Sequence, residues 1–184
     1  MKADRALALS LLVVVVAAAL LLATGRPPIC TCGIVALWEP SASSARTSQM
    51  LSDWYSPSHI VHGLLFYWLL WVFFRRWPVQ RRFLAAVAIE TAWEVIENTP
   101  MVIDRYREAT IALGYNGDSV INSVSDIAMM ALGFLVARRL PVWVSVALAI
   151  TLELAALIVI RDNLTLNIIM LVAPNDAIRA WQAG

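Results

Sequence analysis

Long apolar runs constrain the fold of this chain more than any other feature of its sequence. Ala6–Thr24 is a run of 19 residues whose apolar character only Ser10 interrupts. A helix of that length crosses the roughly 30 Å hydrocarbon core of a bilayer. Lys2 and Arg5 precede the run, and residues 25–28 offer no small-residue cleavage site. We therefore expect an uncleaved transmembrane helix rather than a signal peptide.

Four further apolar runs are expected to cross the membrane, namely Ile60–Phe74, Phe83–Ile103, Val120–Ala137 and Val142–Ile160. The chain is 60% hydrophobic and 15% charged, against about 45–50% and 25% in soluble domains. Leu164–Ala173 has only ten residues, so it should lie at the surface or re-enter the bilayer. The sequence thus predicts an all-α integral membrane protein, a bundle of about five transmembrane helices plus a short C-terminal interfacial or re-entrant helix.

The distribution of basic residues predicts the orientation. Eight of the 14 basic residues lie in three short segments, at Lys2 and Arg5, within residues 75–82, and at Arg138 and Arg139. By the positive-inside rule these segments, and with them the N-terminus, are cytoplasmic. The net charge of +1 gives no basis for a nucleic-acid partner. We expect a multi-pass protein of the bacterial inner membrane.

The whole chain is expected to form one membrane domain over residues 1–184. Residues 6–24 would be the first transmembrane helix and residues 25–58 a periplasmic loop. Residues 59–160 would be a four-helix core around a polar cavity, and residues 161–184 a periplasmic or interfacial segment. We expect Gly63 and Gly133 to allow close helix contact within this core.

Ionisable residues interrupt the apolar runs, although each costs roughly 2.5–3.5 kcal/mol at the centre of a membrane helix. Spacings of three or four residues place each set on one stripe of its helix. The sets are His59 and His62; Glu90, Glu94 and Glu97; and Asp118, Asn122 and Asp126. In the predicted orientation these residues lie toward the periplasmic ends of their helices, except that Glu90, like Glu153 of the last span, lies deeper, near the middle of the bilayer. The sequence therefore predicts a cavity that opens to the periplasm and the outer leaflet.

Two kinds of chemistry fit such a cavity. His59, His62, Glu94 and Asp126 are the ligand types of a divalent metal such as zinc or magnesium. Without a metal, Asp118 and Asp126, or Glu94 with Asp126, would form an acid–base pair. The candidate catalytic residues are therefore Glu94, Asp126 and Asp118. Residues that would contact the substrate or support the ligands are Glu90, Glu97, Asn122, Arg161 and Asp162, with Arg161 holding an anionic group.

Structural roles compete with these assignments. The buried acids would pair with Arg105, Arg107 and Arg161 and help to assemble the bundle. Ser119 would act as a helix cap. Cys30 and Cys32 lie on the predicted oxidising side, where they would form at most a redox-labile bridge.

Four motifs resemble a family of small bacterial inner-membrane proteins of uncharacterised function. They are DWYSPSHIVHG at residues 53–63, ETAWEVIEN at residues 90–98, GDSVINSVSD at residues 117–126 and IRDNLTLN at residues 160–167. The resemblance covers residues 48–181 and implies no activity.

A looser likeness is to VanZ-like membrane proteins. It rests on the order of His59 or His62, Glu90 or Glu94, and Asp126 with Gly133, and it implies at most a shared helical scaffold. Lipoprotein signal peptidases also hold two aspartates near the outer leaflet, which is a likeness of architecture alone.

Two functions from different classes remain open. The first is an intramembrane hydrolase or transferase, with or without a metal, that acts on a lipid-linked substrate at the outer leaflet. The second is a non-enzymatic membrane protein that binds a lipid or small molecule, or that assists assembly of an envelope complex. A transporter is the weaker third reading, because five spans without an internal repeat are few for one.

Overall fold

Among the residues that the structure describes, three helices are long and apolar enough to cross a membrane: α1 (Ala3–Ala23), α5 (Val120–Arg139) and α6 (Val142–Ile160). The computed structural model describes residues 2–110 and 114–184, and within them it contains helices and no strands. The remaining helices are α2 (Ser56–Phe73), α3 (Val79–Glu97), α4 (Pro100–Ala109), α7 (Leu164–Val172) and α8 (Asp176–Ala183). The expected all-α architecture is confirmed, whereas the expected five spans are not.

The predicted span Phe83–Ile103 is wrong at its C-terminal end. Helix α3 ends at Glu97, and a separate helix α4 begins at Pro100. Proline lacks a backbone N–H, and its ring forces the preceding residue into extended backbone, so it can start a helix but cannot continue one. Thr99 accordingly has φ −78° and ψ 150°. The polar end of α3 is thereby separated from a short helix that leaves the bundle.

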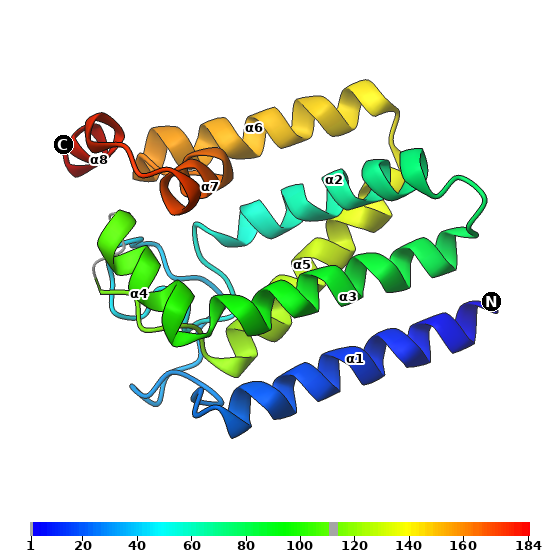
Figure 1. Cartoon of the computed structure of the whole chain (residues 1–184), viewed down its shortest axis with the longest axis horizontal. Coiled ribbons are helices and arrows are strands. Elements are labelled where there is room, and N and C mark those ends of the chain that lie inside the picture. Colours follow the sequence, from blue (N-terminus) through cyan, green and yellow to red (C-terminus); the bar gives the residue numbers. More distant parts are fainter. Residues whose placement is uncertain (1, 111–113) are drawn as a thin grey trace.

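The bundle has one basic end and one end covered by loops (Figure 1). The N-terminus, the α2–α3 turn and the α5–α6 turn lie together at the right of the view. The α2–α3 turn carries Arg75, whose guanidinium carbon lies 4.4 Å above the ring of Trp71. The α1–α2 loop and helices α4, α7 and α8 lie at the opposite end.

Two glycines bring α2 and α5 into backbone contact. A Cβ atom on Gly63 would lie 2.0 Å from the carbonyl oxygen of Met130, and one on Gly133 would lie 2.2 Å from that of Ile60. No side chain fits at either position, so the expected close contact of helices is confirmed.

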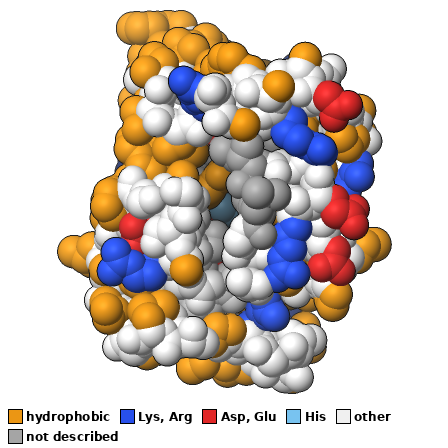
Figure 2. All heavy atoms as spheres, turned by 90° about the vertical axis from the view of Figure 1, so that its left-hand side faces the viewer, with side chains coloured by type: hydrophobic (Ala, Val, Ile, Leu, Met, Phe, Trp, Pro, Cys, Tyr) orange, Lys and Arg blue, Asp and Glu red, His pale blue; other side chains and the backbone are white. Residues whose placement is uncertain are grey.

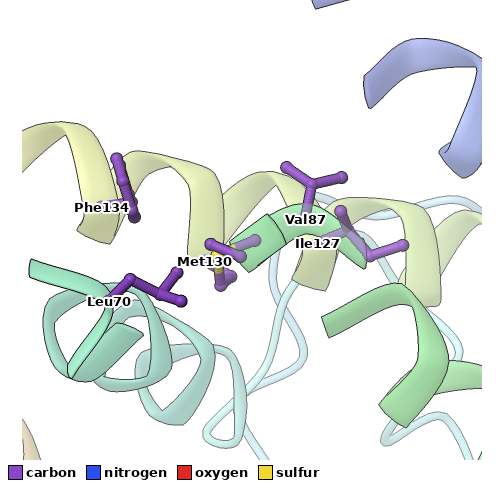
Figure 3. Close-up of a cluster of buried hydrophobic side chains, with 6 residues drawn as sticks. Leu70, Val87, Ile127, Met130 and Phe134 are labelled. Atoms are coloured by element: carbon purple, nitrogen blue, oxygen red, sulfur yellow. The ribbon is translucent and has the colours of Figure 1, made fainter. Parts of the chain in front are cut away.

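An apolar cluster lies where α2, α3 and α5 pack together (Figure 3). Leu70 of α2 and Val87 of α3 pack against Ile127, Met130 and Phe134 of α5. All five side chains are buried. Helix α5 therefore lies between α2 and α3, and its other half is available for the polar residues.

The C-terminal segment follows the prediction of a short helix too short to cross a bilayer, since α7 has 9 residues. Glu153 of α6 does not project toward the polar residues of the bundle. Its carboxylate accepts hydrogen bonds from the backbone N–H groups of Leu164 and Thr165, at 3.1 and 3.0 Å. Carboxylates are favourable at the N-terminus of a helix, where N–H groups lack partners. Glu153 therefore anchors α7 to α6.

Candidate functional site

A cavity of about 820 Å³ opens at the loop-covered end of the bundle. Figure 2 views the molecule from that end and shows a hollow with histidine colour at its floor. Six of the predicted polar residues line the cavity: His59, His62, Glu90, Glu97, Asp118 and Asp126. The three helices α2, α3 and α5 thus bring their polar stripes to one place, as the sequence predicted.

One carboxylate holds both histidines. The Nδ1 atom of His59 lies 2.6 Å from Oε1 of Glu90, and the Nδ1 atom of His62 lies 3.0 and 3.1 Å from the two oxygens of the same group. Glu90 is fully buried and accepts these bonds. Two ligands of one ion would stand about 2.9 Å or more apart, at bond lengths near 2.1 Å. The 2.6 Å contact therefore indicates a hydrogen bond that orients His59 and leaves its Nε2 atom for other partners.

The Nε2 atom of His59 faces Asp126. It lies 3.7 Å from Oδ2 of that residue, while Oε1 of Glu94 lies 3.6 Å from the Nδ1 atom. One ligand atom from each of the three residues falls within 4.8 Å of the others. The other oxygen of Asp126 accepts a hydrogen bond from the Ser56 hydroxyl at 3.1 Å. This group has the donor atoms and the spacing for one divalent cation.

Among the described residues, Glu94 is buried without a hydrogen-bond partner for its carboxylate. It is 1% exposed, and in the described part of the chain no donor reaches either of its carboxylate oxygens. Burying a carboxylate costs several kcal/mol unless it is paired, protonated or bound to a metal. A cation beside Glu94 would give this carboxylate a partner of opposite charge.

Asp118 lies beside this group in the segment before α5. Its carboxylate accepts hydrogen bonds from the side-chain amide of Asn98 at 2.8 Å and from the hydroxyl of Tyr115 at 2.9 Å. Burial raises the pKa of Asp118 to about 6 in spite of these donors. Glu94, Glu97 and Asp118 form a further set whose ligand atoms lie within 4.8 Å of one another.

The arginines expected to pair with the buried acids do not do so. Arg105 donates to the carbonyl of Leu171, Arg107 to that of Tyr115, and Arg161 to that of Trp181. Among residues 2–110 and 114–184, no lysine or arginine forms an ion pair with a cavity-lining carboxylate. Structural ion pairs with arginine therefore do not explain the acids.

Three predicted site residues have other roles. Arg161 is exposed at the end of α6, does not line the cavity, and donates to the carbonyl of Trp181. Asp162 is buried and accepts bonds from the hydroxyl of Tyr55 and the amide of Gln182, which ties α8 to the loop before α2. Asn122 donates to the carbonyl of Met50 at 2.9 Å and anchors the α1–α2 loop on α5.

Sequence reasoning missed several residues that support the site. Asn98 follows Glu94 by four residues on the same stripe, and that spacing could have revealed it. Ser56, at the start of α2, supports Asp126 through the hydrogen bond of its hydroxyl. Asp53 accepts the backbone N–H groups of Ser48 and Tyr55, at 2.7 and 2.8 Å. Asp53 thereby stabilises the conformation of the loop before α2. No feature of the sequence around Asp53 predicts this role.

Two expectations for the loops are confirmed. The Ser119 hydroxyl accepts from the backbone N–H of Asn122 and caps α5. Cys30 and Cys32 are joined in a disulfide.

The comparisons with known proteins identify relatives in bacteria. Residues 21–184 match the family described as a protein of unknown function, DUF2585. A UPF0314 protein of Agrobacterium fabrum is 56% identical over 163 residues, which are 89% of this chain and 82% of that protein. A UPF0314 protein of Paracoccus denitrificans is 52% identical over 94% of this chain and 90% of its own length.

No solved structure matches the chain. The likeness to VanZ-like proteins remains a prediction. The match over residues 21–184, together with relatives that are 56% and 52% identical over most of the chain, places the chain in the DUF2585 family.

Proposed function

We propose that this protein is a metal-assisted hydrolase or transferase of the bacterial inner membrane, and that it acts on a lipid-linked substrate. His59, Glu94 and Asp126 would bind one divalent cation, zinc or magnesium. The observation that carries the proposal is the Glu94 carboxylate, which is buried without a donor and faces an imidazole and a second carboxylate.

The residues around the cation have separate tasks. A bound divalent ion lowers the pKa of a water ligand and polarises an oxygen of the substrate. His62 lines the cavity, and Glu90 holds its Nδ1 atom, so the opposite ring nitrogen is suited to accept a proton from the attacking group. Glu90 also fixes the ring of His59, as carboxylates commonly do for metal-binding histidines.

The cavity walls fit an amphiphilic substrate. Apolar side chains from α2, α3 and α7 line one part of the cavity, among them Phe66, Ile89 and Ile168. Polar residues of the α1–α2 loop, such as Ser44 and Gln49, line another. A hydrocarbon chain would lie along the first wall, with its polar headgroup at the second.

The membrane placement is part of the proposal. Helices α2 and α3 would cross beside α1, α5 and α6, giving five spans. The end with the arginine turns would be cytoplasmic, and the cavity would open to the periplasm. An alkaline phosphatase fusion after Gly184 is then expected to be active, and a fluorescent-protein fusion at the same point to be dark. The reverse result would contradict this orientation.

Metal content tests the central claim. The protein, purified in detergent and dialysed against each ion in turn, is expected to retain at least one divalent ion per chain by mass spectrometry. His59→Ala, Glu94→Gln and Asp126→Asn should each lower the bound metal at least tenfold. Asp104→Asn is the matched control, because this carboxylate is exposed on α4 and should leave the metal unchanged. Wild-type protein without metal at saturating ion would refute the proposal.

Activity is tested with a membrane lipid extract from Agrobacterium fabrum, which encodes a relative. Metal-loaded wild-type protein should convert a lipid in the extract, followed by mass spectrometry, and His62→Ala should not. If a lipid binds but is never converted, the proposal of an enzyme is refuted and the protein is a non-enzymatic lipid binder.

A further inference from the structure

Glu94 belongs to two neighbouring groups of metal-ligating residues. One group contains His59 and Asp126, and the other contains Glu97 and Asp118. Because the ligand atoms of each group lie within 4.8 Å of one another, the two groups meet at the Glu94 carboxylate. A carboxylate has two oxygens with lone pairs for separate partners.

The second group is built from oxygen atoms alone. Asp118 is 5% exposed, and Glu97 is half-buried and lines the cavity. Asn98 and Tyr115 donate to the Asp118 carboxylate, so the position of that group is fixed before any ligand binds. Carboxylates that ligate metals are commonly held by such outer hydrogen bonds.

Charge in this region is unbalanced. Three carboxylates adjoin one another, and among the described residues no lysine or arginine pairs with any of them. Neither oxygen of Glu94 has a hydrogen-bond donor, although the side chain is almost completely buried. One cation beside His59 would occupy one oxygen of Glu94 and leave the other without a partner.

We propose that Glu94 bridges two divalent cations, the second of which is held by Glu94, Glu97 and Asp118. This inference rests on the proposed site at His59, Glu94 and Asp126 and adds a site to it. Oxygen-only ligands favour a hard ion, Mg²⁺ or Mn²⁺, whereas the imidazole of the first site also suits zinc.

Two bridged ions narrow the substrate class. Paired ions about 3.5–4 Å apart bind both the attacking and the leaving oxygens of a phosphoryl group. The headgroup of the lipid-linked substrate would therefore carry a phosphate ester or diphosphate. Arg26 also lines the cavity, and its guanidinium would attract such a headgroup.

Manganese binding tests the second site. In equilibrium dialysis we expect two Mn²⁺ per wild-type chain, and the low-temperature electron paramagnetic resonance spectrum should be that of a coupled pair. Asp118→Asn and Glu97→Gln should each retain one Mn²⁺ with an isolated six-line spectrum. Glu94→Gln should lose the coupling and weaken both ions at least tenfold. Asp104→Asn should behave as wild type.

The outcomes separate the two proposals. One Mn²⁺ per wild-type chain at saturation overturns the bridged pair and leaves the first site intact. No bound ion refutes both. If Asp118→Asn aggregates in size-exclusion chromatography, Glu97→Gln decides, because Glu97 is half-buried and tolerates the change more easily.

Inorganic phosphate probes the substrate class in the manganese-loaded protein. Wild type should bind it, and Glu97→Gln should bind it at least tenfold more weakly. Equal phosphate affinity in the two proteins would contradict the role of the second ion in binding a phosphate headgroup.

Discussion

The same three helices build two unlike halves of the bundle. Toward the basic end, α2, α3 and α5 pack through apolar side chains such as Leu70, Val87 and Phe134. Toward the loop-covered end, the same helices meet through imidazoles and carboxylates. In a bilayer, apolar side chains pack at little cost, whereas each buried charge is unfavourable. The apolar half is explained by packing alone, whereas the proposed metal site would explain the polar half.

The largest effect is expected where the two halves join. Gly133→Ala would place a Cβ atom 2.2 Å from the carbonyl oxygen of Ile60. A backbone atom cannot rotate away, so we expect a loss at the upper end of the usual range for overpacking, about 3 kcal/mol, in the free energy of unfolding. Thermal unfolding in detergent measures it. Gly114→Ala is the control, since no atom lies within 4 Å of its added Cβ. Equal melting temperatures would show that α2 and α5 separate freely.

The next effect concerns the polar half alone. Glu90→Gln removes the charge that both histidines contact. We expect the affinity for the divalent ion to fall about 10–100-fold, as is usual when an orienting carboxylate is lost. The thermal stability of the metal-free protein should change far less than in Gly133→Ala. A titration with Mn²⁺ decides, and an unchanged affinity would mean that Glu90 does not position His59.

These expectations show which parts of the molecule the sequence could predict. Val142–Ile160 is a helix with the predicted bounds, because an unbroken apolar run leaves a membrane segment few alternatives. The stripes of histidines and carboxylates converge as their spacing indicated. Helical spacing alone, however, could not show that Glu94 is buried behind the cavity while Glu97 lines it.

The errors have physical causes. The predicted span reached Ile103 because apolar residues continue past Pro100 in the sequence. In the structure α3 ends before Pro100, since the proline ring cannot be accommodated inside a helix. Arg161 and Asp162 lie at the predicted end of α6 but outside the cavity lining. Their partners, Trp181 and Gln182, come from a C-terminal helix whose fold the apolar pattern did not reveal.

The pH dependence of stability distinguishes Asp162 from the carboxylates of the proposed metal site. Burial raises the pKa of Asp162 from 3.8 to about 6 in the folded protein. Between these values the folded state holds a proton that the unfolded chain has lost. The contribution of Asp162 to the free energy of unfolding is therefore most favourable below about pH 4 and becomes less favourable as the pH rises to about 6.

Asp162→Asn removes this titration. Its melting temperature should exceed that of wild type at pH 7.5 by more than it does at pH 4.5, and its metal content should be unchanged. Differential scanning fluorimetry at the two values is the measurement. A constant difference between the two proteins would show that Asp162 has the same pKa in the folded and unfolded states.

The smallest effect is expected in the apolar cluster. Met130→Leu keeps the volume and the chemistry of a fully buried side chain. Such exchanges usually cost less than about 1.5 kcal/mol. Unfolding in detergent should show a small shift, and metal binding should be unaltered. A loss of metal in this variant would mean that the two halves of the bundle are coupled.

The glycine crossing of α2 and α5 also determines the dimensions of the site. His59 lies one turn before Gly63, and Asp126 lies two turns before Gly133, so both side chains project a short way from a fixed pivot. A small increase in the crossing angle of the two helices would increase the distance between the His59 imidazole and the Asp126 carboxylate. The absence of a side chain at Gly63 and Gly133, outside the cavity, therefore determines how far apart the proposed ligands of the ion stand.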